Sequence, residues 1–142
     1  MPSVTKTVEL PFSPADAFKL ATDPGRFGEW LTIHDSWPQG QPAGPQQGQQ
    51  FVQKIKLMGM PSDVNWTVEE LTDSKLVLKG TGPMGSQVAN VISVAAANGG
   101  SAVSYEAEFS GGAISGPMGD MVTQQAGSEL EKSLAKLKQL AE

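Results

Sequence analysis

The sequence predicts an α+β domain in which a curved antiparallel sheet of six or seven strands wraps around one long C-terminal helix. Runs of alternating apolar and polar residues follow one another between residues 50 and 110, separated by short turns. After Gly111 and Gly112 the apolar spacing changes to three and four residues, which is typical of a helix. At 142 residues the chain has the size of a single domain, residues 1–142, with one hydrophobic core.

One strand and two short helices are expected before the main sheet. Residues 3–10 alternate between an apolar face and a face of lysine and threonine, which predicts a half-buried strand. Ser13 is followed by a proline and then an aspartate, a combination that favours the first turn of a helix. The two predicted helices, residues 14–21 and 26–31, are too short to be stable without packing on a larger element.

A Gly-, Pro- and Gln-rich segment, residues 39–50, is expected to form a surface loop before the main run of strands. Further strands are then predicted at residues 50–58, 63–71, 75–80, 87–97 and 102–110. The breaks between them, among them residues 59–62, consist of turn-forming residues and are too short for a crossover helix. Neighbouring strands are therefore expected to pair antiparallel.

The C-terminal helix is expected to begin near Pro117 and to run for about 20 residues, or roughly 30 Å. Its stripe consists mainly of apolar residues, namely Met118, Met121, Val122, Gln125, Ala126, Leu130, Leu134, Leu137 and Ala141. One helix cannot fill the concavity of a six- or seven-stranded sheet, so this layout predicts a cavity between the two. This arrangement is the helix-grip architecture.

Composition excludes several functional classes. A net charge of -5 argues against a nucleic-acid binder, which needs a basic surface. The chain has no cysteine and one histidine, His34, so neither a thiolate zinc site nor a multi-histidine metal site is expected. No cofactor is expected either.

The chain shows neither a signal peptide nor an apolar run of membrane-spanning length, so we expect a cytoplasmic protein. Nothing in the sequence demands more than a monomer.

Two motifs in the sequence resemble catalytic or cofactor sites. Residues 80–85 spell G-x-G-x-x-G, but a β-type run follows them, whereas a dinucleotide site needs a helix there. We therefore expect a hairpin turn at this position. Glu106 and Glu108 share one face of a strand, but Tyr105 belongs to the opposite, apolar face. We therefore expect both glutamates on the solvated side of the sheet.

His34 has two interpretations. In the functional one it is a general base, or a group that polarises a ligand, at the mouth of the cavity. In the structural one it is a partly buried histidine that fixes the junction between helix and strand. His34 is the candidate catalytic residue that the sequence singles out, and turnover without it would have to rest on Tyr105 or a carboxylate.

Large aromatic and methionine side chains are candidates for the ligand-binding residues. Buried indole groups seek a polar partner, and methionine adapts its shape to varied apolar ligands. Several methionines lie at turns or at the start of the predicted C-terminal helix, where the mouth of the cavity is expected. The candidate ligand-binding residues are Trp30, His34, Trp37, Met58, Trp66, Met84, Tyr105, Met118, Met121 and Val122.

Local motifs strengthen this interpretation: EWLTIH at 29–34, KLMGMP at 56–61, WTV at 66–68 and GPMG at 116–119. Together with the order of elements, they make the whole chain resemble the START-like superfamily, also called SRPBCC. Within that superfamily the chain is similar to the polyketide cyclase/dehydrase and lipid transport group. It looks like a short actinobacterial subgroup, some members of which are described as toxins of type II toxin–antitoxin pairs.

The resemblance implies that the cavity binds a hydrophobic small molecule, such as a lipid, a polyketide or a polycyclic aromatic compound. An enzyme of this kind would be polyketide cyclase-like, would need no cofactor and would promote aldol closure with polar cavity residues. Arg26 is the only arginine, so the sequence shows no Arg/His/Tyr constellation for such a reaction, and turnover stays open. The alternative that the resemblance implies is a toxin that acts through protein interaction and has a small antitoxin-like partner.

Overall fold

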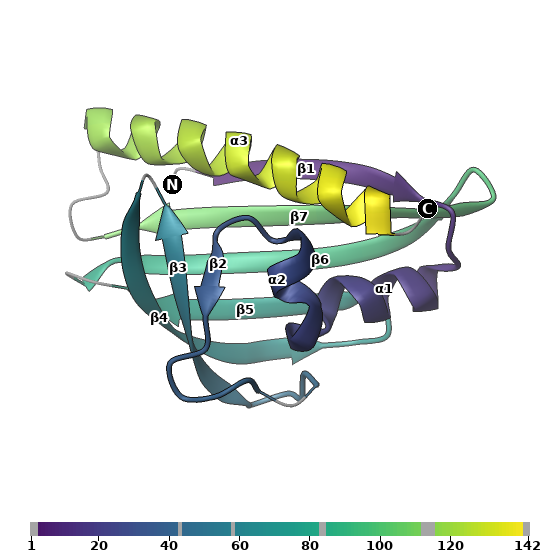
Figure 1. Ribbon diagram of the computed structural model, residues 1–142, viewed down its shortest axis with the longest axis horizontal. Coiled ribbons are helices and arrows are strands. Elements are labelled where there is room, and N and C mark those ends of the chain that lie inside the picture. The colour runs from purple at the N-terminus through teal and green to yellow at the C-terminus, as the bar shows by residue number, and fades with distance from the viewer. Residues whose placement is uncertain (1–2, 43, 58, 83–84, 112–115, 141–142) are drawn as a thin grey trace.

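The protein forms a curled antiparallel sheet with three helices on its inner side (Figure 1). The computed structural model describes residues 3–42, 44–57, 59–82, 85–111 and 116–140. The helical elements are α1 (Pro14–Thr22), a 3-10 turn (Pro24–Arg26), α2 (Phe27–Trp30) and α3 (Gly116–Leu140). The strands are β1 (Ser3–Leu10), β2 (His34–Ser36), β3 (Gln50–Leu57), β4 (Met60–Leu71), β5 (Lys75–Thr81), β6 (Gln87–Ala97) and β7 (Gly100–Ser110).

The strand order of the sheet is β1-β7-β6-β5-β4-β3-β2, and every neighbouring pair is antiparallel. The first strand therefore pairs with the last, with Val8 opposite Val103, while the other strands follow one another as hairpins or loop-connected neighbours. This arrangement confirms the predicted fold class. One strand in it, β2, was not among the predicted segments; it has only 3 residues, and its sequence is polar.

The prediction of a turn over residues 59–62 is wrong, because most of this segment belongs to a strand. The structure places the start of β4 at Met60, which pairs with Leu57, so the β3–β4 connection is shorter than the sequence analysis expects. Gly59 has a φ of 77°, a backbone conformation that glycine adopts at no steric cost. Pro61 then continues the strand opposite Lys56. The end of the strand predicted at 50–58 falls on Met58, which lies outside the described residues.

The start of α1 follows the capping chemistry of its sequence. Ser13 is the N-cap, and its side-chain oxygen accepts a hydrogen bond from the backbone N–H of Asp16 at 3.3 Å. Pro14 occupies the first helical position, where the missing N–H costs nothing. The helix buries Ala17 and Leu20 and packs against β6 and β7, so the short helix is stabilised by the sheet.

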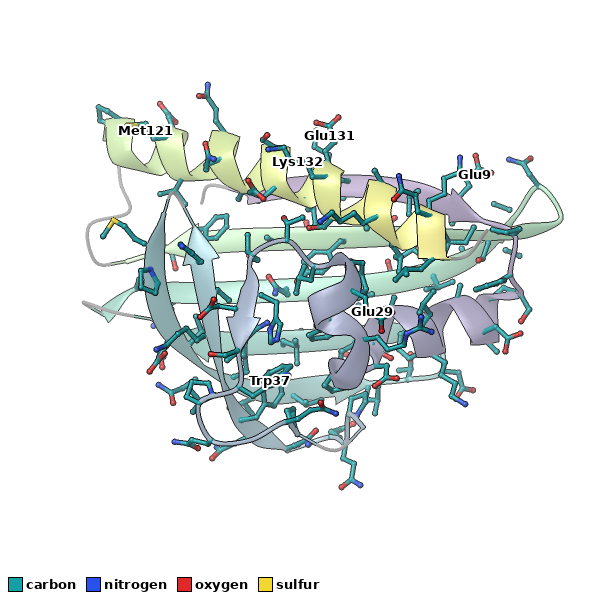
Figure 2. All side chains as sticks on the ribbon, viewed as in Figure 1. Glu9, Glu29, Trp37, Met121, Glu131 and Lys132 are labelled. Carbon is teal, nitrogen blue, oxygen red and sulfur yellow. The ribbon has the colours of Figure 1, made fainter. Side chains whose placement is uncertain are left out.

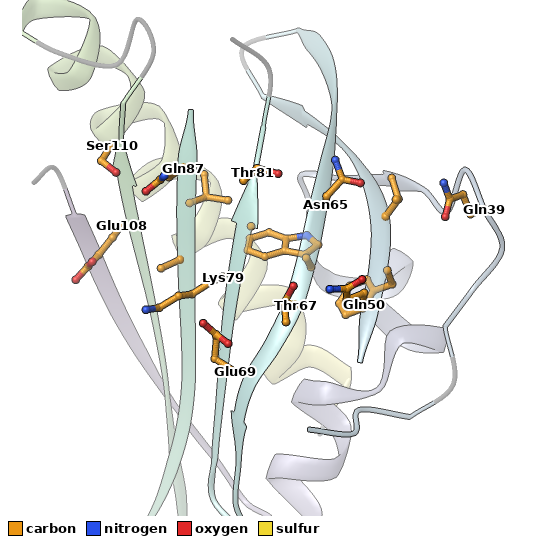
Figure 3. A pocket seen from close by; sticks show the side chains of 16 residues that line it. Gln39, Gln50, Asn65, Thr67, Glu69, Lys79, Thr81, Gln87, Glu108 and Ser110 are labelled. Atoms are coloured by element: carbon orange, nitrogen blue, oxygen red, sulfur yellow. The ribbon is translucent and has the colours of Figure 1, made fainter. Parts of the chain in front are cut away.

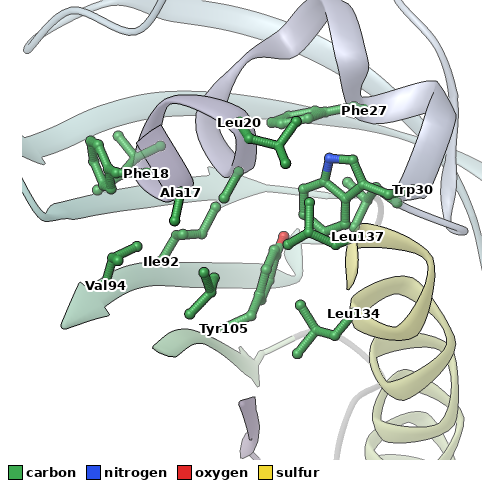
Figure 4. Packing of buried hydrophobic residues seen from close by; sticks show 14 of the residues in the cluster. Ala17, Phe18, Leu20, Phe27, Trp30, Ile92, Val94, Tyr105, Leu134 and Leu137 are labelled. Atoms are coloured by element: carbon green, nitrogen blue, oxygen red, sulfur yellow. The ribbon is translucent and has the colours of Figure 1, made fainter. Parts of the chain in front are cut away.

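The core fills the space between the inner face of the sheet and the three helices (Figure 4). Leu134 and Leu137 of α3 meet Trp30 of α2 and Tyr105 of β7 in this view. Trp30 is 1% exposed and packs edge-on against Phe27, with 5.9 Å between the ring centroids. Burying such aromatic side chains supplies a large share of the hydrophobic stabilisation.

Helix α3 is 25 residues long, somewhat longer than predicted, and it is packed unevenly. Its second half buries Leu130, Leu134 and Leu137, and the helix as a whole packs on β1, β7 and α2. In its first half, residues 116–126, Met121 is 51% exposed and points away from the sheet (Figure 2). The buried apolar side chains of α3 that the structure describes therefore lie in its C-terminal half. In the described part of the chain, no helix is long and apolar enough to cross a membrane.

Candidate functional site

A small apolar cavity lies between the inner face of the sheet and the middle of α3. Its volume is about 60 Å³. Strands β3, β4, β6 and β7, the segment before β2 and one face of α3 all contribute to its wall. The lining residues are Leu31, Ile33, Gln53, Ile55, Val64, Trp66, Val88, Asn90, Tyr105, Ala107, Phe109, Ala126, Glu129, Leu130 and Ser133. Most of these are apolar, so the few polar groups among them determine which ligand chemistry the cavity can hold.

One polar pair of the cavity joins two neighbouring strands. The Asn90 side-chain amide donates a hydrogen bond of 2.8 Å to the Tyr105 hydroxyl. Tyr105 is buried, and burial raises the pKa of its phenol well above the usual value although the Asn90 hydrogen bond opposes this. The phenol therefore stays protonated, and its O–H is available to donate while its oxygen accepts from Asn90.

A second polar group connects α3 to the segment before β2. The Thr32 hydroxyl donates to Glu129 Oε2 at 2.6 Å, and the Thr32 backbone N–H donates to Ser133 Oγ at 2.9 Å. Glu129 also forms an ion pair with Lys132 on the same helix, with 3.6 Å between Nζ and Oε1. Because Glu129 and Ser133 line the cavity as well, this cluster places a carboxylate and a hydroxyl on the helix side of the site.

A third polar group connects three neighbouring strands. Trp66 Nε1 on β4 donates to Gln53 Oε1 on β3 at 3.0 Å, and Gln53 Nε2 lies 2.9 Å from His34 Nδ1 on β2. Trp66 and Gln53 are 4% and 5% exposed, whereas His34 is half-buried. Burial lowers the pKa of His34, an effect that the neighbouring Asp35 partly opposes.

The structure places the predicted site residues in three different settings. Trp66 and Tyr105 line the cavity. Trp30 lies beside it in the core, 6.4 Å from Tyr105 between ring centroids, and its Nε1 has no hydrogen-bond partner among the described residues. His34 and Trp37 pack on each other with 4.7 Å between centroids, and neither belongs to the cavity lining that the structure describes.

The methionine candidates are placed differently from the aromatic ones. Met121 is an exposed side chain of α3, and the half-buried Val122 is not among the described lining residues. Met58 and Met84 lie outside the described residues, and for Met118 the structure gives only its position in the first half of α3.

The polar residues of the cavity are not among the candidates predicted from the sequence; they are Gln53, Asn90, Glu129 and Ser133. A signal existed for two of them. Gln53 alternates in step with Phe51 and Ile55, and Asn90 interrupts an otherwise apolar run, so each occupies an inward position of its strand. A polar residue at an inward strand position is a candidate for a buried hydrogen bond.

A larger hollow of about 860 Å³ lies on the opposite, outer side of the sheet (Figure 3). Its labelled side chains are amides, hydroxyls and charged groups, among them Asn65, Thr67 and Lys79. Glu108 also lies here, separated from Lys79 by Ala89 in the register, and it is on the face opposite Tyr105 as predicted. Apolar side chains border this hollow too, and two of them, Trp66 and Val88, also line the inner cavity. Most of its lining residues are polar, however, and a mostly polar, solvent-open surface suits water better than an apolar ligand.

Among the described residues, no group of three or more His, Cys, Asp or Glu side chains could hold a metal ion.

A curled antiparallel sheet that grips a C-terminal helix, with an apolar cavity between them, defines the START-like class of folds. The whole chain, residues 1–142, matches the sequence pattern of the family described as polyketide cyclase / dehydrase and lipid transport. The chain belongs to this family.

Two relatives of known sequence cover almost the whole chain. An uncharacterised protein of Mycobacterium tuberculosis is 32% identical over 141 residues, which cover 99% of each chain. Another protein of that organism, named as a toxin, is 30% identical over 135 residues, or 94% of each chain.

Two solved structures have the same fold at low sequence identity. A START superfamily protein from Mycobacterium smegmatis has a TM-score of 0.73 at 17% identity, covering 98% of this chain and 96% of that one. A protein from Chromobacterium violaceum has a TM-score of 0.71 at 14% identity, covering 99% of this chain and 96% of that one.

Proposed function

We propose that the protein binds a hydrophobic small molecule in the cavity between the sheet and α3, and that the ligand is a lipid, a polyketide or a polycyclic aromatic compound. The observation that carries this proposal is the apolar lining of the cavity, which converges on a few polar side chains. Family membership supports the same class of ligand.

The size of the cavity sets a condition on this function. Ligand pockets usually measure about 300–1,000 Å³, whereas the volume of this cavity is about 60 Å³. A ligand of that class must therefore widen the site. The first half of α3 is the element proposed to move for this purpose, because Met121 is exposed there, Val122 is only half-buried and Ala126 lies directly on the cavity. The Thr32–Glu129–Ser133 cluster holds the second half in place.

The polar groups of the cavity favour a ligand with both a hydrogen-bond acceptor and a donor. Tyr105 offers a phenolic O–H on the sheet side, which suits a carbonyl or ether oxygen. Glu129 offers carboxylate oxygens on the helix side, which suit a hydroxyl. If the protein turns over its ligand as a cyclase-like enzyme, these two groups are the proposed proton donor and acceptor, because they line the cavity and His34 does not.

An amide-resolved NMR titration tests the proposal, with palmitate, a flavonoid and an aromatic polyketide as the ligands. We expect saturable shifts at the cavity residues Val64, Tyr105 and Leu130 for at least one of them. Saturable shifts confined to the outer hollow, or no saturable shift with any ligand, would contradict the proposal.

A pair of matched variants on α3 sharpens this test. Ala126→Met adds side-chain volume directly at the cavity, whereas Ala135→Met makes the same change at an exposed position of the same helix. We expect Ala126→Met to weaken binding by about tenfold or more and Ala135→Met to leave it within about twofold. Equal affinities of the two variants would place the ligand elsewhere.

A toxin function is the second candidate, because the relative that is named as a toxin is 30% identical over 94% of each chain. In this proposal the protein acts through a protein interaction and is neutralised by a small partner. Induced expression in a mycobacterial host tests it. Arrested growth that requires the intact fold would support the proposal, and unchanged growth at a confirmed level of soluble protein would contradict it. The unfolded control is a variant with a charge in the core, Leu137→Asp.

A further inference from the structure

The hydrogen bonds from Trp66 to Gln53 and from Gln53 to His34 form a chain from the cavity wall to the edge strand β2. We infer that Gln53 is a positioning residue that holds the Trp66 indole against the cavity, and that protonation of His34 releases this hold. The consequence for ligand binding rests on the function proposed above, whereas the chain itself can be tested without a ligand.

The chemistry of the three side chains fixes the direction of the chain. An indole N–H can only donate, so the atom of Gln53 that faces Trp66 must be its carbonyl oxygen. The amide nitrogen of Gln53 then faces His34 and donates to it. His34 Nδ1 must therefore carry no proton, and in the neutral ring the proton lies on Nε2.

Protonation of His34 is incompatible with this arrangement. In the imidazolium form Nδ1 becomes a donor, and it would face the donating amide nitrogen of Gln53. Rotating the Gln53 amide restores that contact but turns its nitrogen toward the Trp66 N–H, which also donates. One hydrogen bond must therefore break, and because Gln53 and Trp66 are both buried, the unpaired group is costly.

Two effects shift the pKa of His34, namely burial and one charged neighbour. Asp35 on the same strand favours the protonated form, while burial disfavours it more strongly. The ring packs on the uncharged Phe27 of α2, with 6.2 Å between centroids, and on Trp37. The other charged residues on the packed elements are Lys54 and Lys56, which flank its partner Ile55 on β3, and Glu29 of α2, which pairs with Arg26.

The position of Trp66 explains why its release affects the cavity. Its indole lines the cavity and lies over Gly80 of the neighbouring strand, where no side chain holds it from below. The Gln53 hydrogen bond is the polar contact recorded for its ring nitrogen. When that bond is lost, the indole can turn without displacing another side chain at position 80, and this part of the wall becomes adjustable.

NMR of the indole N–H groups tests the chain in the protein without ligand. We expect the Trp66 Nε1–H signal to titrate with His34, with a midpoint below the ordinary histidine pKa of about 6.5. Trp30 is the internal reference, because its buried Nε1 is not part of the chain. Trp37 is unsuitable, because its ring lies directly on His34.

Two variants separate the hydrogen-bonded chain from a through-space effect. Gln53→Leu removes the connection, so Trp66 is expected to stop titrating while His34 still does. Gln53→Glu supplies an acceptor to both neighbours and is expected to raise the pKa of His34 and to keep the Trp66 signal constant through its titration. An unchanged Trp66 titration in either folded variant would overturn the inference, as would a wild-type Trp66 signal that does not follow His34.

A fluorescence titration with 1-anilinonaphthalene-8-sulfonate tests the effect on binding. We expect binding to tighten by about threefold or more from pH 7.5 to pH 5.5 in the wild type, and by less in Gln53→Leu, since a released wall widens more easily. Equal affinity at both pH values in the wild type would overturn the coupling to the cavity. No binding at either pH, together with a titrating Trp66 signal, would count against the proposed function and leave the hydrogen-bonded chain standing.

Discussion

The indole of Trp66 on β4 lies over Gly80, its direct cross-strand neighbour on β5. A Cβ atom at position 80 would come within 2.7 Å of Trp66 Cε3 and 2.8 Å of Val64 Cγ1. The strand therefore accommodates this tryptophan on the cavity side only because residue 80 has no side chain. The missing side chain at position 80 makes room for the Trp66 indole, and the indole in turn shapes one cavity wall.

Replacing Gly80 by alanine is expected to destabilise the protein. Because the added methyl group overlaps with the indole and with Val64, we expect a loss of about 1–3 kcal/mol in the free energy of unfolding. Urea denaturation followed by circular dichroism measures this change. Gly44→Ala is the matched control, because a Cβ at position 44 meets no atom within 4 Å. Equal stability of the two variants would show that the packing of the Trp66 indole does not require a glycine at position 80.

Removing the Thr32 hydroxyl is expected to loosen the attachment of α3. Thr32→Val keeps the shape of the side chain but removes the 2.6 Å hydrogen bond to the Glu129 carboxylate. We expect a loss of about 1–2 kcal/mol in the free energy of unfolding, since hydrogen bonds to charged groups are the stronger ones. Thr7→Val removes an exposed hydroxyl contact to Ser104 and should cost less than about 0.5 kcal/mol. A cost for Thr32→Val as small as for this control would contradict the assigned role of the cluster.

Stability is expected to fall on acidification through His34. Burial lowers the pKa of His34 in the folded chain below the value of about 6.5 in the unfolded chain. The neutral form of His34 therefore makes its full contribution to the free energy of unfolding above about pH 6.5. This contribution is lost as the pH falls through the folded-state pKa. Urea unfolding of the wild type and of His34→Gln between pH 7.5 and pH 5 measures it. We expect the stability difference between the two proteins to shift against the wild type in acid; a constant difference would contradict the assigned pKa direction.

The two halves of α3 are expected to exchange their amide hydrogens at different rates. Met121 is exposed and Val122 and Ala126 are half-buried in the first half, whereas Leu130, Leu134 and Leu137 are buried in the second. Local opening should therefore cost less in the first half, and we expect its protection factors to be about tenfold lower or more. Native-state hydrogen exchange by NMR measures both halves in one sample. Uniform protection along the helix would exclude the first half as the part that moves for a ligand.

The order of elements could be predicted because strong local signals mark their ends. Strand β6 was predicted with its observed bounds, since turn residues enclose an unbroken β-type run. Strand β2 could not be predicted, because its three polar residues carry no periodic signal and its pairing with β3 depends on the tertiary fold. The predicted start of β4 was wrong for a related reason. Cross-strand pairing, such as that of Pro61 with Lys56, determines where the strand begins, and the turn-forming composition of residues 59–62 does not.

The sequence could predict only some of the side chains that line the cavity: of the tryptophan and tyrosine candidates, Trp66 and Tyr105 line it, whereas Trp30 and Trp37 are not among the lining residues that the structure describes. Trp66 and Tyr105 are large side chains at inward strand positions, and both line the cavity. Gln53 was missed because its role depends on hydrogen bonds to two partners on neighbouring strands, which the sequence alone does not show. Glu129 was missed because the rotation of α3 about its axis, which follows from packing, directs it toward the cavity.

The most direct test of the binding site is a set of intermolecular nuclear Overhauser effects between a bound ligand and methyl groups of the protein. The methyl groups of Ile55 and Val64 line the inner cavity, and those of Val52 and Thr67 line the outer hollow of the same sheet. We predict contacts from the ligand to Ile55 and Val64 only. Contacts to Val52 and Thr67, with none to the inner methyl groups, would contradict the assignment of the cavity as the hydrophobic binding site.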